Sequence, residues 1–369
     1  MTAKVSIARC GNYEFERVMA AVRRSVDLVG GIGGVVKPGA KVLLKPNLLS
    51  ARLPEEGVDT NPEVVRAVVR LVKEAGASSI DIGDSPGGYR KNTDEVFEMS
   101  GMKRLAEEEG VGIVKFNSSR NIDGFPVSRH VLDADCVISI PKFKTHGITT
   151  LTAGVKNMFG ALTGLYKARC HSKAPREEDF AKILAKVYAI ARPDLTVLDA
   201  VVAMEGDGPS GGDLRSTGFV MASSDAVAID AVLAKLVGLE PLDLAVTKTC
   251  YEDGLGEADL AKIELAGDSI DSFMMPDFKL PQTKILKMIP RAIINKAASL
   301  VKFKPVIDDQ ICKRCNLCKL TCPVHAITIE ADRCAINYKK CVRCLCCDEV
   351  CPYGAISIKR NILAKMVWR

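Results

Sequence analysis

Aromatic residues are scarce in this chain of 369 residues: Phe, Tyr and Trp together make up 5%, and Trp occurs once. Proteins that bind single-stranded nucleic acids stack the bases on aromatic side chains that lie among basic ones. The basic segment 279–304 has no interleaved run of aromatics. We therefore expect no nucleic-acid partner.

Long apolar runs are also missing. No stretch of 18 apolar residues occurs, which predicts no transmembrane helix and no membrane association. The N-terminal stretch MTAKVSIARCGNYEFE lacks the apolar region of a signal peptide. Six of the fourteen cysteines show no paired spacing, which is typical of free thiols in a reducing cytoplasm. These six are Cys10, Cys136, Cys170, Cys250, Cys334 and Cys346.

The other eight cysteines form two runs, CKRCNLCKLTCP and CVRCLCCDEVCP, and each position recurs 29 residues later. The spacing C-x2-C-x2-C-x3-C-P is typical of [4Fe–4S] ligation, with the fourth thiolate of each run serving the other cluster. A zinc site, the alternative, favours paired CxxC units. The spacing assigns Cys312, Cys315, Cys318 and Cys351 to cluster I, and Cys341, Cys344, Cys347 and Cys322 to cluster II. Cys334 and Cys346 fall outside this register and are interpreted as non-ligands.

These runs resemble the bacterial-type two-cluster ferredoxins over roughly residues 305–360. The resemblance implies a small α+β unit that carries two [4Fe–4S] clusters. The repeated stretches Ala326–Ile329 and Ala355–Ile358 predict short strands that cover the clusters.

The first 270 residues alternate strand-like and helix-like segments, which predicts an α/β fold with a mostly parallel sheet and helices on both faces. We expect one helix over 94–109, a helix over 61–75 that Asn61 caps, and a strand over 195–199. The predicted organisation is an α/β domain at 1–278, a basic linker at 279–304, the ferredoxin-like domain at 305–360 and a tail at 361–369.

Polar motifs follow several of these strands, and ligands bind at such carboxyl ends in parallel sheets. The motif from Pro141 to Gly160 is the most informative. If the chain stays extended, Lys142, Lys144 and His146 lie on one side, where they suit a small anionic substrate. Lys156 and Asn157 follow and could complete this site, or the lysines could be solvated.

A second motif, Asp199 to Gly212, joins Asp199, Glu205 and Asp207 to a glycine-rich loop. It could form an anion nest, bind a divalent cation, or be an acidic turn. The remaining motifs contain Lys45, Asn47, Asp84 and Ser85 as candidate substrate contacts. Gly83–Gly87 fits the G-x-S-x-G pattern of serine hydrolases, but Pro86 has no N–H for an oxyanion hole, which excludes that reading. Catalysis is assigned to Lys142, Lys144, His146 and Asp199.

Together these motifs resemble the family called domain of unknown function 362, over roughly residues 40–240. Many members of this family are similar to this chain in having a two-cluster ferredoxin domain fused on the C-terminal side. The resemblance supplies no reaction.

Charge is divided unevenly along the chain. Residues 279–369 contain 18 Lys and Arg against 6 Asp and Glu, although the net charge of the whole chain is only +6. If this basic region is an electron-transfer unit, it favours an acidic redox partner. The simpler interpretation is a solvated basic surface. The basic, apolar segment 279–304 fits either a linker helix or, less simply, a membrane-surface element broken by Pro290.

Three functions remain open from the sequence. The first is an electron-transfer protein or oxidoreductase, in which the clusters exchange single electrons with a substrate or unidentified ligand in the α/β domain. The second is a non-redox enzyme that acts on an anionic substrate and has structural or regulatory clusters. The third is a ferredoxin-type docking subunit.

Overall fold

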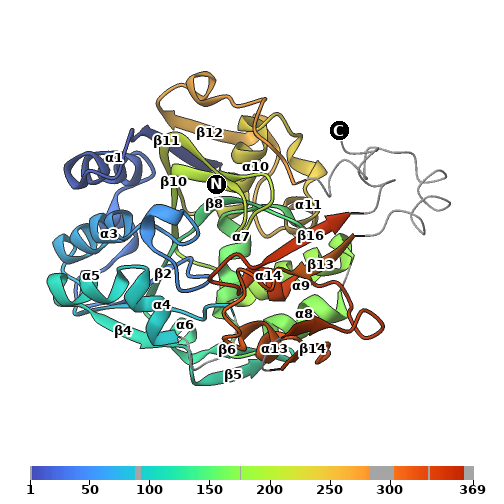
Figure 1. Ribbon diagram of the computed structural model, residues 1–369. Helices are drawn as coiled ribbons and strands as arrows, with labels where there is room; N and C mark the ends of the chain where they lie inside the picture. Colours follow the sequence, from blue (N-terminus) through green and yellow to red (C-terminus); the bar gives the residue numbers. More distant parts are fainter. Residues whose placement is uncertain (1, 88–92, 175, 282–302, 331–332, 361–369) are drawn as a thin grey trace.

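The computed structural model describes all residues except 1, 88–92, 175, 282–302, 331–332 and 361–369. Most of the predicted linker and the whole predicted tail lie outside these described residues. A ten-stranded sheet organises the larger part of what is described (Figure 1). Its strands are β1 (Ala3–Arg9), β2 (Lys41–Pro46), β3 (Ser79–Asp84), β4 (Gly112–Lys115), β7 (Cys136–Ile140), β8 (Lys142–His146), β9 (Thr150–Thr152), β10 (Leu195–Glu205), β11 (Asp213–Ser223) and β12 (Ile263–Gly267).

The sheet order is β12-β1-β11-β10-β7-β2-β3-β4, and β8 and β9 continue from β10. Strands β4, β3, β2, β7 and β10 run parallel, as do β1 and β12. β11 is antiparallel to both of its neighbours. The sheet is therefore mostly parallel, and the carboxyl ends of β2, β3 and β7 meet at one edge.

Helices cover both faces of the sheet. On β2, Val42 and Leu44 join one buried core while Leu43 joins the other, because successive side chains of a strand point to opposite faces. The first core packs under α1 (Phe15–Leu28), α3 (Pro62–Glu74) and α5 (Met102–Glu109). The second core packs under α9 (Glu177–Ile190), α10 (Ala226–Leu236) and α11 (Ala245–Glu252). The α/β prediction is confirmed.

Five further α-helices in the described residues of the α/β part are short. They are α2 (Ile32–Val35), α4 (Thr93–Met99), α6 (Arg129–Leu132), α7 (Gly154–Asn157) and α8 (Tyr166–Lys173). A small hairpin, β5 (Ser119–Ile122) and β6 (Phe125–Ser128), lies outside the main sheet.

Local signals placed some element ends correctly. Asn61 caps α3 as predicted, because its side chain accepts a hydrogen bond from the N–H of Glu63. The single helix predicted over 94–109 is wrong. It is divided into α4 and α5 at Gly101, whose φ of 79° leaves the right-handed helical region.

The strand predicted over 195–199 is too short. β10 continues to Glu205 and turns back into β11 as a hairpin, with Glu205 opposite Asp213. The extension follows from burial, since Val201, Ala203 and Met204 all lie in the interior. Asp199 consequently lies within a strand and not at its end.

The C-terminal part is a separate small arrangement of strands and helices (Figure 1). It comprises β13 (Phe303–Ile307), α13 (Leu317–Thr321), β14 (Ile327–Ile329), β15 (Cys334–Ile336), α14 (Cys346–Glu349) and β16 (Ile356–Arg360). β13 pairs with β16 and β14 with β15, both antiparallel. The two predicted repeat strands are therefore present as β14 and β16.

Candidate functional site

β8 places three predicted catalytic side chains on one strand. Lys142, Lys144 and His146 are each at most 2% exposed. Lys142 stands opposite Asp199 of β10 in parallel register. The three side chains do not share one cavity, because each has a different set of partners.

Lys142 lies in a closed polar network. Its Nζ donates to Asp199 Oδ2 at 2.9 Å and to the Tyr13 hydroxyl at 2.5 Å. Tyr13 in turn donates to Asp199 Oδ1 at 2.8 Å, and the N–H of Asn61 donates to Asp199 Oδ2 at 2.9 Å. Burial lowers the pKa of Lys142, while the Asp199 carboxylate opposes that shift. These partners hold β8, β10 and the start of α3 together.

Lys144 occupies a neighbouring buried site. Its Nζ donates to the carbonyl of Val58 at 2.5 Å. Burial lowers the pKa of Lys144 to about 7 and raises that of the nearby Asp59 carboxyl to about 7. Each group's charge favours the charged form of the other.

His146 reaches the C-terminal part of the chain. Its Nδ1 accepts from the N–H groups of Ile148 and Thr149, at 3.1 and 3.3 Å, so the ring proton belongs on Nε2. Nε2 lies 3.2 Å from Glu349 Oε1 on α14. Burial lowers the pKa of His146 to about 3, which keeps the imidazole neutral.

Lys45 and Asp84 form a buried ion pair at the carboxyl ends of β2 and β3. Lys45 Nζ lies 2.8 Å from Asp84 Oδ1. The Asp84 carboxylate also accepts from the N–H groups of Leu48 and Ser85, both at 2.8 Å. Asn157 completes this cluster by donating to the carbonyl of Lys45 at 3.1 Å. The polar residues at the ends of β2 and β3 therefore meet as the parallel topology predicts.

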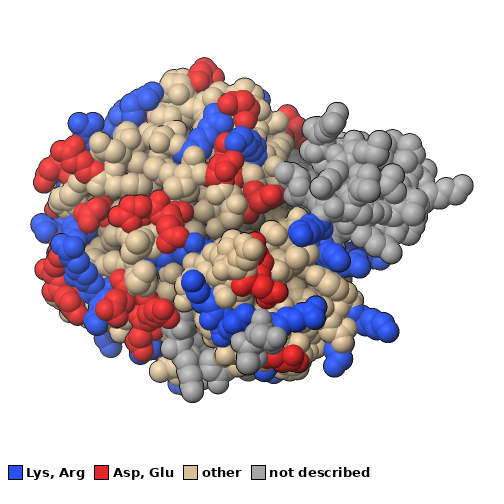
Figure 2. Space-filling view, in the orientation of Figure 1, with Lys and Arg blue, Asp and Glu red and all other residues tan. Residues whose placement is uncertain are grey.

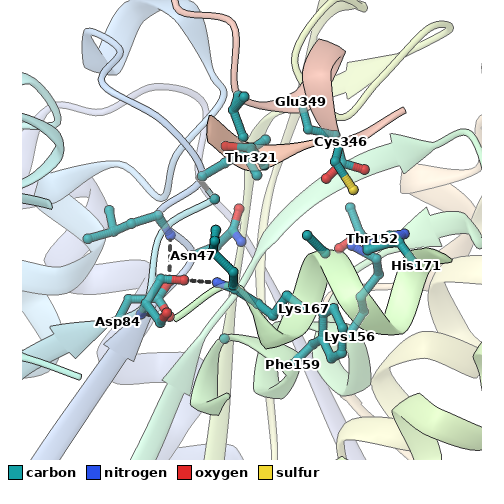
Figure 3. A pocket seen from close by; sticks show the side chains of 18 of the residues that line it. Asn47, Asp84, Thr152, Lys156, Phe159, Lys167, His171, Thr321, Cys346 and Glu349 are labelled. Carbon is teal, nitrogen blue, oxygen red and sulfur yellow. Dashed lines mark hydrogen bonds between the residues drawn. The ribbon is translucent and has the colours of Figure 1, made fainter. Parts of the chain in front are cut away.

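A pocket lies beside this ion pair (Figure 3). Five of the predicted substrate contacts line it: Asn47, Asp84, Ser85, Lys156 and Asn157. None of the four predicted catalytic residues lines it, and Lys45 lies behind the lining residues Asp84 and Asn157. Sequence motifs thus located the pocket better than they located the assigned catalytic groups.

Other pocket residues escaped sequence reasoning. Lys167 and His171 come from α8, which contains none of the motifs, and Phe159 lies within the Pro141–Gly160 motif but was not predicted to be a contact. Thr321, Cys346, Glu349 and Val350 come from the C-terminal part, so the pocket is built jointly by sequence regions about 200 residues apart (Figure 3). Burial lowers the pKa of Lys167 to about 8 and that of His171 to about 4.

Polar groups of the motif Asp199–Gly212 already have partners within the protein. Glu205 Oε2 lies 3.2 Å from Arg215 and accepts from the N–H of Lys279 at 3.1 Å. The N–H of Gly208 donates to Thr145 Oγ1 at 3.2 Å, so it does not face a free anion. Asp207 is exposed near the tip of the hairpin. In the described residues, no three His, Cys, Asp or Glu side chains gather closely enough to hold one metal ion.

The two cysteine runs share a repeated backbone geometry. Three pairs of residues with positive φ recur at the 29-residue spacing: Arg314 and Arg343, Asn316 and Leu345, His325 and Gly354. Such left-handed residues turn successive N–H groups inward, an arrangement that binds anions.

Backbone N–H groups also point at the cysteine sulfurs. The N–H of Ala326 donates to Cys322 Sγ at 3.2 Å, and the N–H of Ala355 donates to Cys351 Sγ at 3.4 Å. These two bonds are again 29 residues apart. Cys315 and Cys318 both lie within electrostatic range of Cys351 from the other run. Crossed ligation of two cubanes fits this donor set, because thiolates with N–H donors are its ordinary ligands.

Polar contacts fasten α14 to the α/β part. Arg52 Nη2 donates to the carbonyl of Cys351 at 2.9 Å, and Ser210 donates to the carbonyl of Asp348 at 3.4 Å. Arg52 is itself oriented by Glu56, 2.5 Å away. The helix that contains Cys347 therefore has a defined position against the pocket.

Comparison with known proteins gives a family but no reaction. The chain is 39% identical over 290 residues, 76% of its length, to the "Thylakoid-associated protein sll1697" of Synechocystis, and covers 89% of that protein. Among solved structures, the lactate racemase apoprotein of Thermoanaerobacterium thermosaccharolyticum has a TM-score of 0.37 at 13% identity, with 60% of this chain and 54% of that one covered. A Thermotoga maritima protein has a TM-score of 0.31 at 15% identity, with 52% and 50% covered.

The chain spans about half the length of these two solved structures. The family model described as "Domain of unknown function (DUF362)" matches residues 42–235, which contain β2, β3, β7, β8 and β10 and most of the pocket. The chain therefore belongs to the DUF362 family.

Proposed function

We propose that this protein is an iron–sulfur electron-transfer protein or oxidoreductase, whose C-terminal unit exchanges single electrons with a molecule bound in the pocket. One observation carries the proposal: α14 forms part of the pocket wall through Cys346 and Glu349. Cys346 adjoins Cys347, a proposed ligand of cluster II. A redox centre and a binding site would thus be neighbours.

The proposed ligands are Cys312, Cys315, Cys318 and Cys351 for cluster I, and Cys341, Cys344, Cys347 and Cys322 for cluster II. When bound, [4Fe–4S] clusters supply one-electron transfer at a potential set by hydrogen bonds and exposure. The chain's own part is to donate N–H groups to the sulfurs, as Ala326 and Ala355 do. Arg52 and Ser210 hold α14 against the pocket.

Anaerobic reconstitution with iron and sulfide, followed by EPR of the reduced protein, tests the clusters. We expect roughly eight iron atoms per chain and a reducible cubane signal. Cys318→Ser should remove or alter one cluster's signal, whereas the matched variant Cys346→Ser should leave both intact. The absence of a reducible signal, or stoichiometric zinc in the purified protein, would refute the electron-transfer function.

A non-redox reaction on an anionic substrate is the second candidate. It is favoured by Lys167, whose pKa of about 8 lets the amine take up and release protons near neutral pH. Turnover that survives in a folded Cys318→Ser variant would support this candidate over the first.

The partner is proposed to be an acidic one-electron carrier. Exposed basic side chains surround the cysteine runs: Lys313, Lys319, Lys339, Lys340 and Arg343. Figure 2, in the orientation of Figure 1, shows basic side chains on the part of the surface where the C-terminal unit lies. Opposite charge steers such encounters.

A cytoplasmic location is part of the proposal and is supported by the unpaired cysteines. Among the described residues, no helix combines the length and apolar character needed to cross a bilayer. The name of the Synechocystis relative associates that protein with thylakoids.

A further inference from the structure

Three buried polar atoms, each on a residue that lines the pocket, have no hydrogen-bond partner among the described residues. They are Asn47 Oδ1, His171 Nδ1 and Thr321 Oγ1. His171 is 4% exposed and Thr321 is 3% exposed. Leaving a buried polar group unpaired costs about 1–3 kcal/mol. Three such atoms around one cavity indicate a molecule that supplies their partners.

Lys156 brings an ammonium group to the same cavity. Within the described part of the chain its ammonium makes no hydrogen bond and no ion pair, and it is partly exposed to the pocket (Figure 3). Lys167 donates to the carbonyls of Ser85 and Pro86. Since an ammonium has three N–H donors, Lys167 retains one for a ligand.

The pocket and its immediate surroundings contain two carboxylates, Asp84 and Glu349, and three lysines, Lys45, Lys156 and Lys167. Asp84 has Lys45 and two backbone N–H groups as partners. Glu349 lies beside the neutral imidazole of His146 and interacts electrostatically with Lys156. The three lysines exceed the two carboxylates by one positive charge, so the cavity favours a ligand with a negative charge.

Apolar side chains form much of the remaining wall. Leu48, Leu49, Leu165 and Ala168 line it, together with the ring of Phe159. Phe159 lies edge-on to His171, with ring centroids 5.9 Å apart. A bare inorganic ion would leave this apolar surface uncovered, whereas an organic ligand would bury it.

We propose that the pocket binds a small organic anion, with a carboxylate or phosphate held by Lys156 and Lys167 and an apolar body against Phe159. Asn47, His171 and Thr321 hydrogen-bond the ligand's polar atoms. This inference deepens the proposed function, because it names the chemical class of the pocket ligand. The redox role of the ligand rests on the proposed function, whereas its binding does not.

The test is calorimetric titration of the reconstituted full-length protein with benzoate, phenyl phosphate and inorganic phosphate. Benzoate or phenyl phosphate should bind at least about tenfold more tightly than inorganic phosphate, and which of the two does so identifies the anionic group. Lys156→Met should weaken binding about 10- to 100-fold, as expected for a charge-assisted hydrogen bond. Lys182→Met removes an exposed lysine on α9 and should leave binding unchanged.

The inference would be overturned if neither organic probe binds, or if wild type and Lys156→Met bind with equal affinity. The pocket would then contain water and not an organic anion. Thermal unfolding of each variant verifies folding, and Lys167→Met replaces Lys156→Met if the latter does not fold. EPR-active protein that binds neither probe contradicts this inference alone. Protein that binds a probe but has no cubane signal contradicts the electron-transfer proposal alone.

Discussion

Lysines of the same sequence motif have different roles once the chain is folded. Lys142 and Lys144 are buried beside carboxylates, while Lys156 faces the pocket without an ion-pair partner among the described residues. Burying a charge is tolerated only where a partner compensates its lost hydration. The first two lysines therefore stabilise the junction of β8 with its neighbours, and the third is available to a ligand.

His171 gives a prediction at this scale. Its pKa is about 4 in the folded protein, chiefly because of burial, and near 6.5 when unfolded. The unfolded chain therefore takes up a proton as the pH falls below 6.5, and stability is lost between pH 6.5 and 4. His171→Gln should remove about 2 kcal/mol of the loss between pH 7 and pH 5.

Urea unfolding at both pH values measures this effect. His130→Gln, on α6 outside the pocket, is the matched control for replacing a histidine by glutamine. An unchanged pH dependence in His171→Gln would show that the imidazole is not buried in its neutral form.

Close backbone packing at α7 and the turn after it determines the pocket floor. A Cβ at Gly160 would lie 2.3 Å from Asp84 Oδ1 and 2.6 Å from Lys45 Nζ. The absence of a side chain there lets the turn approach the buried ion pair. The geometry of this short element thus depends on residue 160 being a glycine.

Gly160→Ala should therefore destabilise the protein by about 1–3 kcal/mol, the usual cost of overpacking a core. We expect a lower midpoint of thermal unfolding and weaker binding of the pocket probe. Gly33→Ala in α2 is the matched control, because a Cβ there meets nothing within 4 Å. Equal midpoints for the two variants would mean that the ion pair moves aside without cost.

In the whole molecule, the C-terminal unit has two different sides. α14 is buried against the pocket, whereas Cys315 is exposed and has basic neighbours. This asymmetry suits a path from an external carrier at the exposed side to a pocket ligand at the buried side.

Electron exchange with an acidic flavodoxin used as a probe should slow by about tenfold as NaCl is raised from about 50 to 500 mM, because salt screens exposed charges. Stopped-flow absorbance measures the rate. Lys339→Glu with Lys340→Glu should slow it at low salt, and Lys182→Glu should not. A rate that is independent of salt would place the docking surface elsewhere.

The sequence alone determined the features that depend on neighbours along the chain. These are the α/β alternation, the Asn61 cap, the repeated cysteine spacing, and the strand-end motifs whose Asn47, Asp84 and Lys156 line the pocket. It missed α8 and the β10–β11 extension, since burial by distant segments and not local propensity decides them.

Tertiary structure alone decided which polar groups are paired and which face the pocket. The contact of His146 with Glu349 and that of Arg52 with Cys351 join residues about 200 and 300 positions apart. Sequence spacing contains no information about such contacts, because the docking of two separately patterned units creates them. For that reason the cysteine runs were recognisable in the sequence, while their position beside the pocket was not.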